Sequence, residues 1–244
     1  LFEGIKDFVL RDGKRIRPII YVLAYKGYTR RNDFPYGKLL RSSLALELLH
    51  CFLLVHDDVI DKSDLRRGKP SLHKFFGAKF KSLSDGKVGE DMAIVAGDVI
   101  FALAMDAFLA IDEKPYLKEK ALKRFVEAVS LTGAGEFIDV NNGVKDLDKV
   151  KEEEVFFTYT MKTAKYTFEA PLVMGAILGG ADDHEIKRLS RLGTLLGQAF
   201  QMQDDMLDLF STDKEIGKPT GSDIMEGKKT LLVWQAYDRL DEKG

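Results

Sequence analysis

The feature that most constrains this chain is an apolar stretch from Leu44 to Asp61 that ends in a cluster of carboxylates. Its apolar residues recur at helical spacing, so the stretch predicts one long helix packed in a core. On such a helix Asp57 and Asp61 lie one turn apart on the same face, and Asp58 lies about 100° round the axis. Adjacent carboxylates repel each other, and the negative end of the helix dipole adds to that repulsion. The cluster therefore points to a divalent cation that compensates its charge.

The same pattern returns far along the chain, where a second apolar helical run ends in Gln201-Met-Gln-Asp-Asp-Met-Leu-Asp208. One Asp-Asp-x-x-Asp pattern is weak evidence for metal binding, but two copies that each close an apolar helix are strong evidence. Asp182-Asp183 lacks the third Asp, because Ile186 stands in its place, and we interpret it as a loop or helix cap. The predicted metal ligands are Asp57, Asp58, Asp61, Asp204, Asp205 and Asp208.

Length and composition exclude several classes of protein. The chain has 244 residues, of which 45% are apolar and 31% charged, which is the balance of a soluble globular protein with a substantial core. A net charge of -2 gives no general attraction to nucleic acid or to an anionic membrane, so we expect no nucleic-acid partner. The single Cys51 excludes an internal disulfide and a cysteine zinc site, and it fits a cytoplasmic location.

Residues 93–111 form an apolar stretch long enough to suggest a membrane span. This stretch contains Asp98 and Asp106, and each would cost about 3 kcal/mol at a bilayer centre. We interpret it as a buried core helix and expect no transmembrane segment. Because the chain opens at Leu1 rather than Met and closes after a charged helix, we also expect it to be truncated or disordered at both ends.

Helical spacing of apolar residues dominates the rest of the chain, and strand-like alternation is nearly absent. The sequence therefore predicts an all-α fold, with residues 1–244 in a single domain of about ten helices whose long inner helices carry the Asp clusters. A polar, glycine-containing surface loop is expected at 79–90. The predicted helices span 2–10, 16–29, 37–61, 91–111, 115–130, 132–142, 148–168, 170–179, 183–210 and 226–241.

Two groups of cations accompany the first Asp cluster. Lys14, Arg15 and Arg17 lie where an N-terminal loop meets a helix, which suits an anion, although in isolation a solvated basic turn is the better explanation. Arg66 and Arg67 follow the cluster closely and would clamp a polyanion that metal ions also bridge. Diphosphate fits both requirements. The alternative is that these arginines form salt bridges with the Asp cluster.

Other polar residues lie on apolar helical faces, each with a structural alternative. His50 lies about 20° from the line of Asp57 and is either a hydrogen-bonded core residue or part of the site; His56 is interpreted as structural. Lys162 and Thr163 lie mid-helix, where Lys162 shares a face with Tyr159 and Tyr166 and needs an anionic partner. Gly193 and Gly197 share the stripe of Gln201, Asp204 and Asp208, and serve either close helix packing or ligand room. Two further cations, Lys218 and Lys228, follow the second cluster.

From Asp12 to about Leu232 the sequence closely resembles the trans-isoprenyl diphosphate synthases, the polyprenyl synthetase family. The motifs that carry the resemblance are Asp57-Asp-Val-Ile-Asp61 followed by Leu65-Arg-Arg-Gly68, then Gln203-Asp-Asp-Met-Leu-Asp208, and Gly13-Lys-Arg-Ile-Arg-Pro18. The resemblance implies the isoprenoid synthase fold, a helical bundle around a central active-site cavity. One departure is Gly135-Glu136, where many members carry Gly-Gln, and we expect it to leave the chemistry undisturbed.

The resemblance also implies roles for individual residues. It places Lys14, Arg17, His50 and Arg67 on isopentenyl diphosphate, and Arg66, Lys162, Lys218 and Lys228 on the allylic diphosphate. Thr163 and Gln201 would lie beside the reacting carbons. Three magnesium ions would bridge the two motifs through the allylic diphosphate, with Asp57, Asp61 and Asp204 as direct ligands and Asp58, Asp205 and Asp208 close by or bound through water.

The expected reaction joins isopentenyl diphosphate to dimethylallyl, geranyl or farnesyl diphosphate by ionisation, condensation and elimination. Magnesium and basic side chains would turn the allylic diphosphate into a leaving group, and helix packing would exclude water from the allylic cation. By resemblance to the archaeal-type geranylgeranyl diphosphate synthases, the expected product is C20, with C15 and C25 as alternatives. Leu53 would form the floor below the first motif and Phe52 a side wall.

Three competing interpretations are weaker. A class I terpene cyclase carries one Asp-rich motif, but its second metal motif is normally of the Asn/Ser/Glu type, and Lys14 and Arg17 also argue against it. A non-catalytic partner subunit of an active synthase would have lost an Asp or Arg from one site, and none is missing. A calcium-binding module lacks the alternating Asp or Asn ligands around a Gly that it requires. A homodimer is the common state of the family and is expected here.

Overall fold

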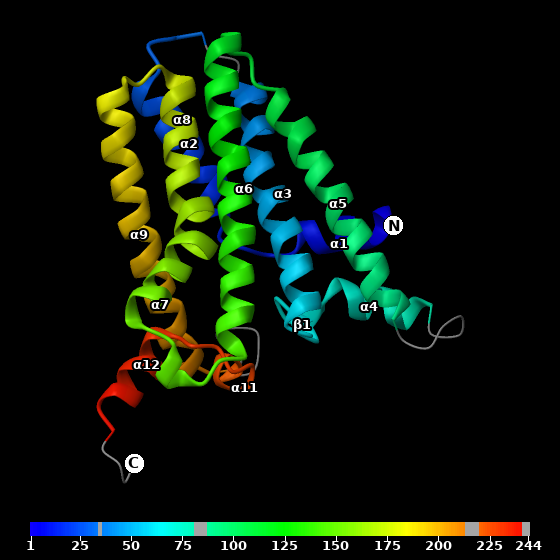
Figure 1. Cartoon of the computed structure of the whole chain (residues 1–244). Coiled ribbons are helices and arrows are strands. Elements are labelled where there is room, and N and C mark those ends of the chain that lie inside the picture. Colours follow the sequence, from blue (N-terminus) through cyan, green and yellow to red (C-terminus); the bar gives the residue numbers. More distant parts are fainter. Residues whose placement is uncertain (34–35, 81–86, 213–219, 241–244) are drawn as a thin grey trace. The chain divides into compact units, whose positions relative to one another are not determined.

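The computed structural model describes residues 1–33, 36–80, 87–212 and 220–240. It confirms the predicted all-α fold, with a single two-stranded hairpin among the described residues (Figure 1). The chain forms two compact units, unit 1 with Leu1–Val22 and Asp33–Asp112 and unit 2 with Leu23–Asn32 and Glu113–Gly244. Helix α2, Ile16–Tyr28, contributes residues to both units. The assignment of the whole chain to one domain stays a prediction.

Unit 1 is built around the pair α3 and α5, which pack against each other along their lengths (Figure 1). Their interface includes Cys51, Val55, Ala96 and Ile100, all buried in one apolar cluster. Small residues on α5 allow the close approach, since a Cβ at Gly97 would lie 2.4 Å from His56 Nε2. The elements of this unit outside α2 are α1 (Phe2–Leu10), α3 (Tyr36–Ile60), β1 (Leu65–Arg66), β2 (Lys69–Pro70), α4 (Leu72–Lys79) and α5 (Val88–Leu109).

Unit 2 is organised around α8, Ala170–Gly179, in which eight of ten residues are buried. Helices α6 and α9 run beside it (Figure 1). The segment that leads into α8 is a π-helix, η2, at Tyr159–Glu169, and π-helical turns occur often at functional sites. The remaining elements are α6 (Pro115–Gly143), η1 (Leu147–Lys149), α7 (Glu152–Thr158), α9 (Asp183–Phe210), α11 (Ser222–Met225) and α12 (Leu231–Asp238).

Helix α9 begins and ends as predicted. The Asp182 side chain accepts a 2.9 Å hydrogen bond from the Glu185 N–H, so Asp182-Asp183 is confirmed as a helix cap.

Other helices differ from their predicted boundaries. The predicted helices 115–130 and 132–142 are one helix, α6, which continues through its glycines. Helix α4 was not predicted because it is short. The helix begins after Ser71 and buries Leu72 and Phe76. A serine directly before apolar residues at helical spacing is a typical N-cap pattern, and this pattern could have predicted the helix.

The remaining differences concern turns. The predicted helix 148–168 is a short 3₁₀ turn followed by α7 and η2. The predicted helix 226–241 begins too early, since Gly227 has a φ of +72° and α12 starts only at Leu231; the short helix α11, which precedes this range, was not predicted. Of the predicted loop 79–90, residue 79 ends α4 and 88–90 begin α5, whereas 81–86 lie outside the described residues. Periodicity therefore located the helices, while local turn chemistry decided where they end.

Two described helices, α3 and α5, are long and apolar enough to cross a membrane by length and composition alone. Half of the most apolar window of α3 is buried inside the structure. On α5 the buried residues include Ala93, Ala96, Ile100 and Phe108. The burial of these residues is that of a core helix, as predicted for 93–111.

Helix α6 provides a matched test of close helix packing. A Cβ at Gly135 would lie 2.4 Å from the backbone nitrogen of Lys162 on η2, whereas a Cβ at Gly133 meets nothing within 4 Å. We expect Gly135→Ala to lower the free energy of unfolding by about 1–3 kcal/mol. Gly133→Ala should raise it by about 0.5–1 kcal/mol through helix propensity alone. Urea denaturation of both variants measures the difference, and equal effects would contradict the packing.

Candidate active site

A tight hairpin follows the first Asp cluster and sets the direction of two arginines. Strands β1 and β2 are joined by Arg67 and Gly68, whose φ angles are +56° and +71°. Positive φ at both central residues matches the twist of a two-residue hairpin, and glycine adopts it without strain. The turn follows α3 closely and therefore holds Arg66 and Arg67 near the end of that helix.

Arg66 forms ion pairs with the first Asp cluster. Its Nε donates to Asp58 Oδ1 at 2.7 Å and its Nη2 to Asp57 Oδ2 at 3.2 Å. Asp58 is fully buried, and burial raises the pKa of its carboxyl to about 6, with Arg66 opposing the shift and Asp57 adding to it. Burial alone would lower the pKa of Arg66, but the two carboxylates raise it above its ordinary value. For Arg66, the salt-bridge alternative is the arrangement observed.

Glu47, a residue without a predicted role, holds two of the nearby arginines. It is buried on α3 ten residues before Asp57, where it forms an ion pair with Arg15 and lies 3.6 Å from Arg67 Nη2. Arg15 also donates to the Val9 carbonyl at 3.1 Å, near the end of α1. A charged residue within the apolar run of α3 needs a partner, and that was the signal in the sequence. Arg15 therefore has a structural role in this turn.

His50 lies among four guanidinium groups. Burial, followed by the positive charges of Arg17, Arg67, Arg66 and Arg15, lowers its pKa well below the ordinary value, so the imidazole is neutral at pH 7. Of the predicted isopentenyl diphosphate ligands, three are therefore brought together in unit 1, namely Arg17, His50 and Arg67. Lys14, the fourth, is exposed. A neutral imidazole that feels several positive charges is compatible with an anion, although Arg15, Arg66 and Arg67 are also paired with carboxylates.

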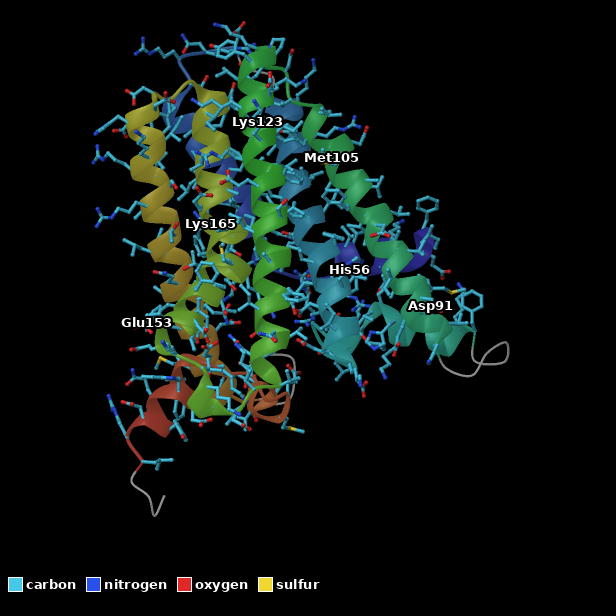
Figure 2. All side chains as sticks on the ribbon, in the orientation of Figure 1. His56, Asp91, Met105, Lys123, Glu153 and Lys165 are labelled. Atoms are coloured by element: carbon cyan, nitrogen blue, oxygen red, sulfur yellow. The ribbon has the colours of Figure 1, made fainter. Side chains whose placement is uncertain are left out.

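His56 (labelled in Figure 2) and Phe52 lie on α3 and contact residues of α5. His56 Nε2 lies 3.2 Å from the Ile94 carbonyl, which agrees with the structural interpretation. The Phe52 ring is 5.2 Å from that of Phe101 on α5 and 4.7 Å from the His56 ring. Leu53, the next residue, is partly buried.

In unit 2 the second Asp cluster is placed by an unusually close contact between α9 and η2. A Cβ at Gly193 would lie 2.6 Å from the Glu169 Cα, and one at Gly197 would lie 2.3 Å from the Ala164 Cα. These glycines serve close packing, which was one of their two interpretations. One turn further along α9, Gln201 accepts a 2.6 Å hydrogen bond from the Thr163 hydroxyl.

Asp205 and Asp208 of the second cluster are buried and accept hydrogen bonds from described protein donors. Asp205 is buried, and it accepts hydrogen bonds from the Tyr159 hydroxyl and from Gln201 Nε2, the latter at 2.9 Å. Burial raises the pKa of Asp205 to about 6 against the effect of these donors. Asp208 is also buried, and it accepts from the Ser222 hydroxyl at 2.8 Å and the Asp223 N–H at 3.1 Å. Asp204, by contrast, is exposed.

Lys162 has the anionic partner that its position requires, and in fact has two. Its Nζ lies 2.7 Å from Asp139 Oδ2 and 2.8 Å from Glu136 Oε2, both on α6. Lys162 and Tyr159 were predicted to share a face, but Lys162 contacts α6 whereas Tyr159 contacts α9 and α12, because the segment is π-helical rather than α-helical. The Glu at position 136 thus pairs with Lys162.

Lys218 and Lys228 are the two cations predicted to follow the second cluster. Lys228 is partly buried and its Nζ lies 2.7 Å from Glu226. The Lys228 N–H donates to the Asp223 carbonyl at 2.9 Å, so the segment is anchored beside the partner of Asp208. Lys218 lies outside the described residues.

The donor set suits a hard divalent cation. Among residues 1–33, 36–80, 87–212 and 220–240, no three His, Cys, Asp or Glu side chains converge into a ready metal-binding group. Asp58 Oδ2, in the first Asp cluster, is among the buried side-chain atoms that have no hydrogen-bond partner within this described part of the chain. Magnesium is commonly held by one or two carboxylates together with substrate phosphates, so an incomplete carboxylate set fits that ion.

The sequence pattern of the polyprenyl synthetases matches residues 1–244. The chain belongs to the polyprenyl synthetase family. This polyprenyl synthetase is 36% identical over 243 residues to a short chain isoprenyl diphosphate synthase of Methanothermobacter thermautotrophicus. The aligned region covers 100% of this chain and 69% of that relative. It is 33% identical over 241 residues to a geranylgeranyl diphosphate synthase of Methanosarcina mazei, with 98% of this chain and 68% of that one covered.

Solved structures agree with the family assignment. The fold resembles that of geranylgeranyl pyrophosphate synthase from Corynebacterium glutamicum, crystallised with isoprenyl diphosphate and magnesium, with a TM-score of 0.91 at 28% identity. That comparison covers 100% of this polyprenyl synthetase and 69% of the solved chain. A polyprenyl synthase from Caulobacter crescentus, crystallised with calcium and isoprenyl diphosphate, gives 0.84 at 29% identity and covers 99% of this chain and 66% of its own. Both of these relatives were crystallised with a divalent metal and isoprenyl diphosphate.

The raised pKa of Asp205 predicts a specific pH dependence of stability. Its pKa of about 6 in the folded state exceeds the ordinary value of 3.8, so the folded state holds the proton more tightly than the unfolded state does. The resulting stability is fully present below about pH 4 and is lost as the pH rises through about 6. We expect wild type to lose about 2 kcal/mol relative to Asp205→Asn between pH 4.5 and 7.5. A difference in unfolding free energy that stays constant over this range would contradict the shift.

Proposed function

We propose that this chain is a magnesium-dependent trans-prenyltransferase that condenses isopentenyl diphosphate with dimethylallyl, geranyl and farnesyl diphosphates to give geranylgeranyl diphosphate. The observation that carries the proposal is that each of two long helices, α3 and α9, ends in an Asp-Asp-x-x-Asp cluster. Arginine forks adjoin the first cluster and Lys228 follows the second. Family membership and relatives that are themselves named geranylgeranyl diphosphate synthases support the proposal.

Both motifs would act on one allylic diphosphate, and three magnesium ions would be held by Asp57, Asp61 and Asp204. The buried carboxylates Asp58, Asp205 and Asp208 would support these ligands from behind. Their engagement with Arg66, Tyr159, Gln201 and Ser222 supports this division. Magnesium, when bound, would supply charge neutralisation for the leaving diphosphate.

The basic residues would bind the two diphosphates separately. Arg66, Lys162, Lys218 and Lys228 would contact the allylic diphosphate, and Lys14, Arg17, His50 and Arg67 isopentenyl diphosphate. To do so, Arg66 would exchange part of its pairing with Asp57 and Asp58 for phosphate oxygens. Guanidinium forks bind carboxylate and phosphate with the same bidentate geometry, so this exchange costs little. Lys162 would act from its position between Glu136 and Asp139.

In the reaction the allylic C–O bond breaks, which gives a delocalised cation and free diphosphate. The double bond of isopentenyl diphosphate then attacks the cation and forms the new C–C bond. A proton leaves the resulting cation, and the departing diphosphate accepts it. Thr163 and Gln201, hydrogen-bonded to each other, would lie beside the reacting carbons, and the packed helices would exclude water that traps the cation.

The first alternative is a farnesyl (C15) or a longer-chain (C25 and above) synthase. The second is a non-catalytic partner subunit of such an enzyme. A homodimer, a cytoplasmic location and the count of three magnesium ions stay predictions. Incubation with isopentenyl diphosphate, each allylic primer and magnesium, followed by product sizing, distinguishes all of these activities.

The metal assignment predicts a large loss of activity from one substitution in either motif. Asp57→Ala and Asp204→Ala should each raise the barrier by about 4 kcal/mol, a loss of about 10³-fold in turnover. Asp106→Ala, which removes an exposed carboxylate paired with Arg41 on the surface of unit 1, should remain within about twofold of wild type. Turnover is measured with radiolabelled isopentenyl diphosphate. Near-normal turnover by either motif variant would refute the assignment.

Product length tests the proposed floor below the first motif. Leu53→Phe should block the growing tail and shorten the main product from C20 to C15, as measured by chromatography of the dephosphorylated alcohols. Phe52→Ala is the comparison, because the Phe52 ring packs against Phe101 and His56 as a side wall. We expect that variant to keep C20 as its main product. If Leu53→Phe leaves the product unchanged while Phe52→Ala lengthens it, Phe52 forms the floor instead.

A further inference from the structure

Tyr159 has no role in the chemistry described above, although its side chain lies beside the second aspartate-rich motif. It is the first residue of η2 and is 6% exposed. Its ring belongs to an apolar cluster with Val150, Val155 and Leu231. A buried phenol needs hydrogen-bond partners for its hydroxyl, and the identity of those partners is informative.

The Tyr159 hydroxyl joins two segments that are far apart in the sequence. It donates its proton to Asp205 Oδ2 and accepts a 2.8 Å hydrogen bond from the Leu231 N–H. A phenol has one proton to donate, and here that proton points to the carboxylate while an oxygen lone pair receives the backbone donor. The directions of both bonds are therefore determined by the chemistry of the partners.

On the side of α9, this hydroxyl orients a chain of side chains. With Oδ2 of Asp205 held by Tyr159, Oδ1 accepts from Gln201 Nε2 at 2.9 Å. The Gln201 amide must then present its oxygen in the other direction, where it accepts from Thr163 at 2.6 Å. The orientations of Gln201 and Thr163 thus follow from the position of Asp205.

On the other side, the hydroxyl anchors the beginning of α12. Leu231 is the first residue of that helix, and N–H groups in a first turn have no partner within the helix. The Thr230 side chain accepts from the Val233 N–H, and Tyr159 accepts from that of Leu231. Lys228 precedes this helix by three residues, so the anchor also limits where Lys228 lies.

We propose that Tyr159 is a positioning residue that aligns the second aspartate-rich motif with the Lys228 segment, because its one hydroxyl holds both Asp205 and the Leu231 N–H. Tyr159 acts through these groups and touches no reacting atom, so it is not a catalytic residue. The inference rests on the proposed function, since it assigns the aligned groups to binding magnesium and the allylic diphosphate. Both groups that the Tyr159 hydroxyl holds, Asp205 and the Leu231 N–H, belong to unit 2, whereas the proposed isopentenyl diphosphate ligands belong to unit 1.

The test is Tyr159→Phe, with Tyr21→Phe as a matched control. Tyr21 is also buried, and its hydroxyl lies 3.0 Å from Ser42 Oγ in unit 1, so the control removes one buried hydroxyl far along the chain from the second motif. The first readout is the rise in melting temperature on adding magnesium chloride with inorganic diphosphate. We expect Tyr159→Phe to lose at least half of the wild-type rise and Tyr21→Phe to keep it, whatever each variant loses without ligand.

The second readout is steady-state kinetics. Tyr159→Phe should raise the KM for the allylic diphosphate and the magnesium requirement by roughly 10-fold, as expected for a residue behind metal ligands, and leave the KM for isopentenyl diphosphate unchanged. If Tyr159→Phe does not fold, Leu231→Pro removes the backbone donor at a first helical position that accepts proline, and the same selective change is expected. Because Leu231→Pro also removes a buried side chain from the apolar cluster, its control is Leu231→Ala, which keeps the N–H and should not show the selective change. A variant that folds and retains both the full ligand-induced rise and the wild-type KM values would overturn the proposal.

The two proposals fail separately. If wild type binds magnesium and diphosphate with a clear rise in melting temperature but forms no prenyl product, the proposed activity is wrong while the alignment by Tyr159 is still tested by the variants. If wild type forms product and Tyr159→Phe loses stability without any selective change toward the allylic substrate, Tyr159 is merely structural. That second result contradicts the inference and leaves the prenyltransferase intact.

Discussion

Burying carboxylates at the ends of two long helices is the constraint on which the rest of this structure depends. An isolated buried carboxylate is costly, so each buried Asp must receive hydrogen bonds or a counter-charge. Asp58 receives the Arg66 guanidinium from a two-residue hairpin, whereas Asp205 receives neutral donors from Tyr159 and Gln201. In both cases burial still raises the pKa to about 6, because it disfavours the charged carboxylate, and a nearby cation would stabilise that charged form.

The two aspartate-rich motifs therefore reach a similar electrostatic state by different means. In unit 1 the Arg66 guanidinium compensates the charge of Asp57 and Asp58. Another buried carboxylate, Glu47, pairs with the neighbouring arginines Arg15 and Arg67. In unit 2 there is no comparable arginine among the described contacts of Asp205, and its donors are brought close by the glycine contacts of α9 on η2. The first motif is thus held by charge and the second by close backbone packing.

Much of the fold followed from the sequence because helical periodicity is a local property. Helix α9 was predicted to its boundaries, since Asp182 is a recognisable N-cap and the apolar stripe is continuous. Helix α6 was wrongly divided, because its glycines resemble a break until the neighbouring backbone of η2 is known. The π-helical geometry of η2 was also missed, and with it the separate contacts of Lys162 and Tyr159, because no local pattern distinguishes a π-helix from an α-helix.

By itself the sequence determined the helical class, the two carboxylate clusters and, through their resemblance to known motifs, the family. These depend on residue identity and spacing along one helix, which the chain carries locally. Tertiary structure alone decided which carboxylates are turned inward, that Arg66 pairs with Asp57 and Asp58, and that Tyr159 connects Asp205 to α12. Such pairings join residues up to 72 positions apart, and their partners are chosen by packing, which spacing along a helix does not encode.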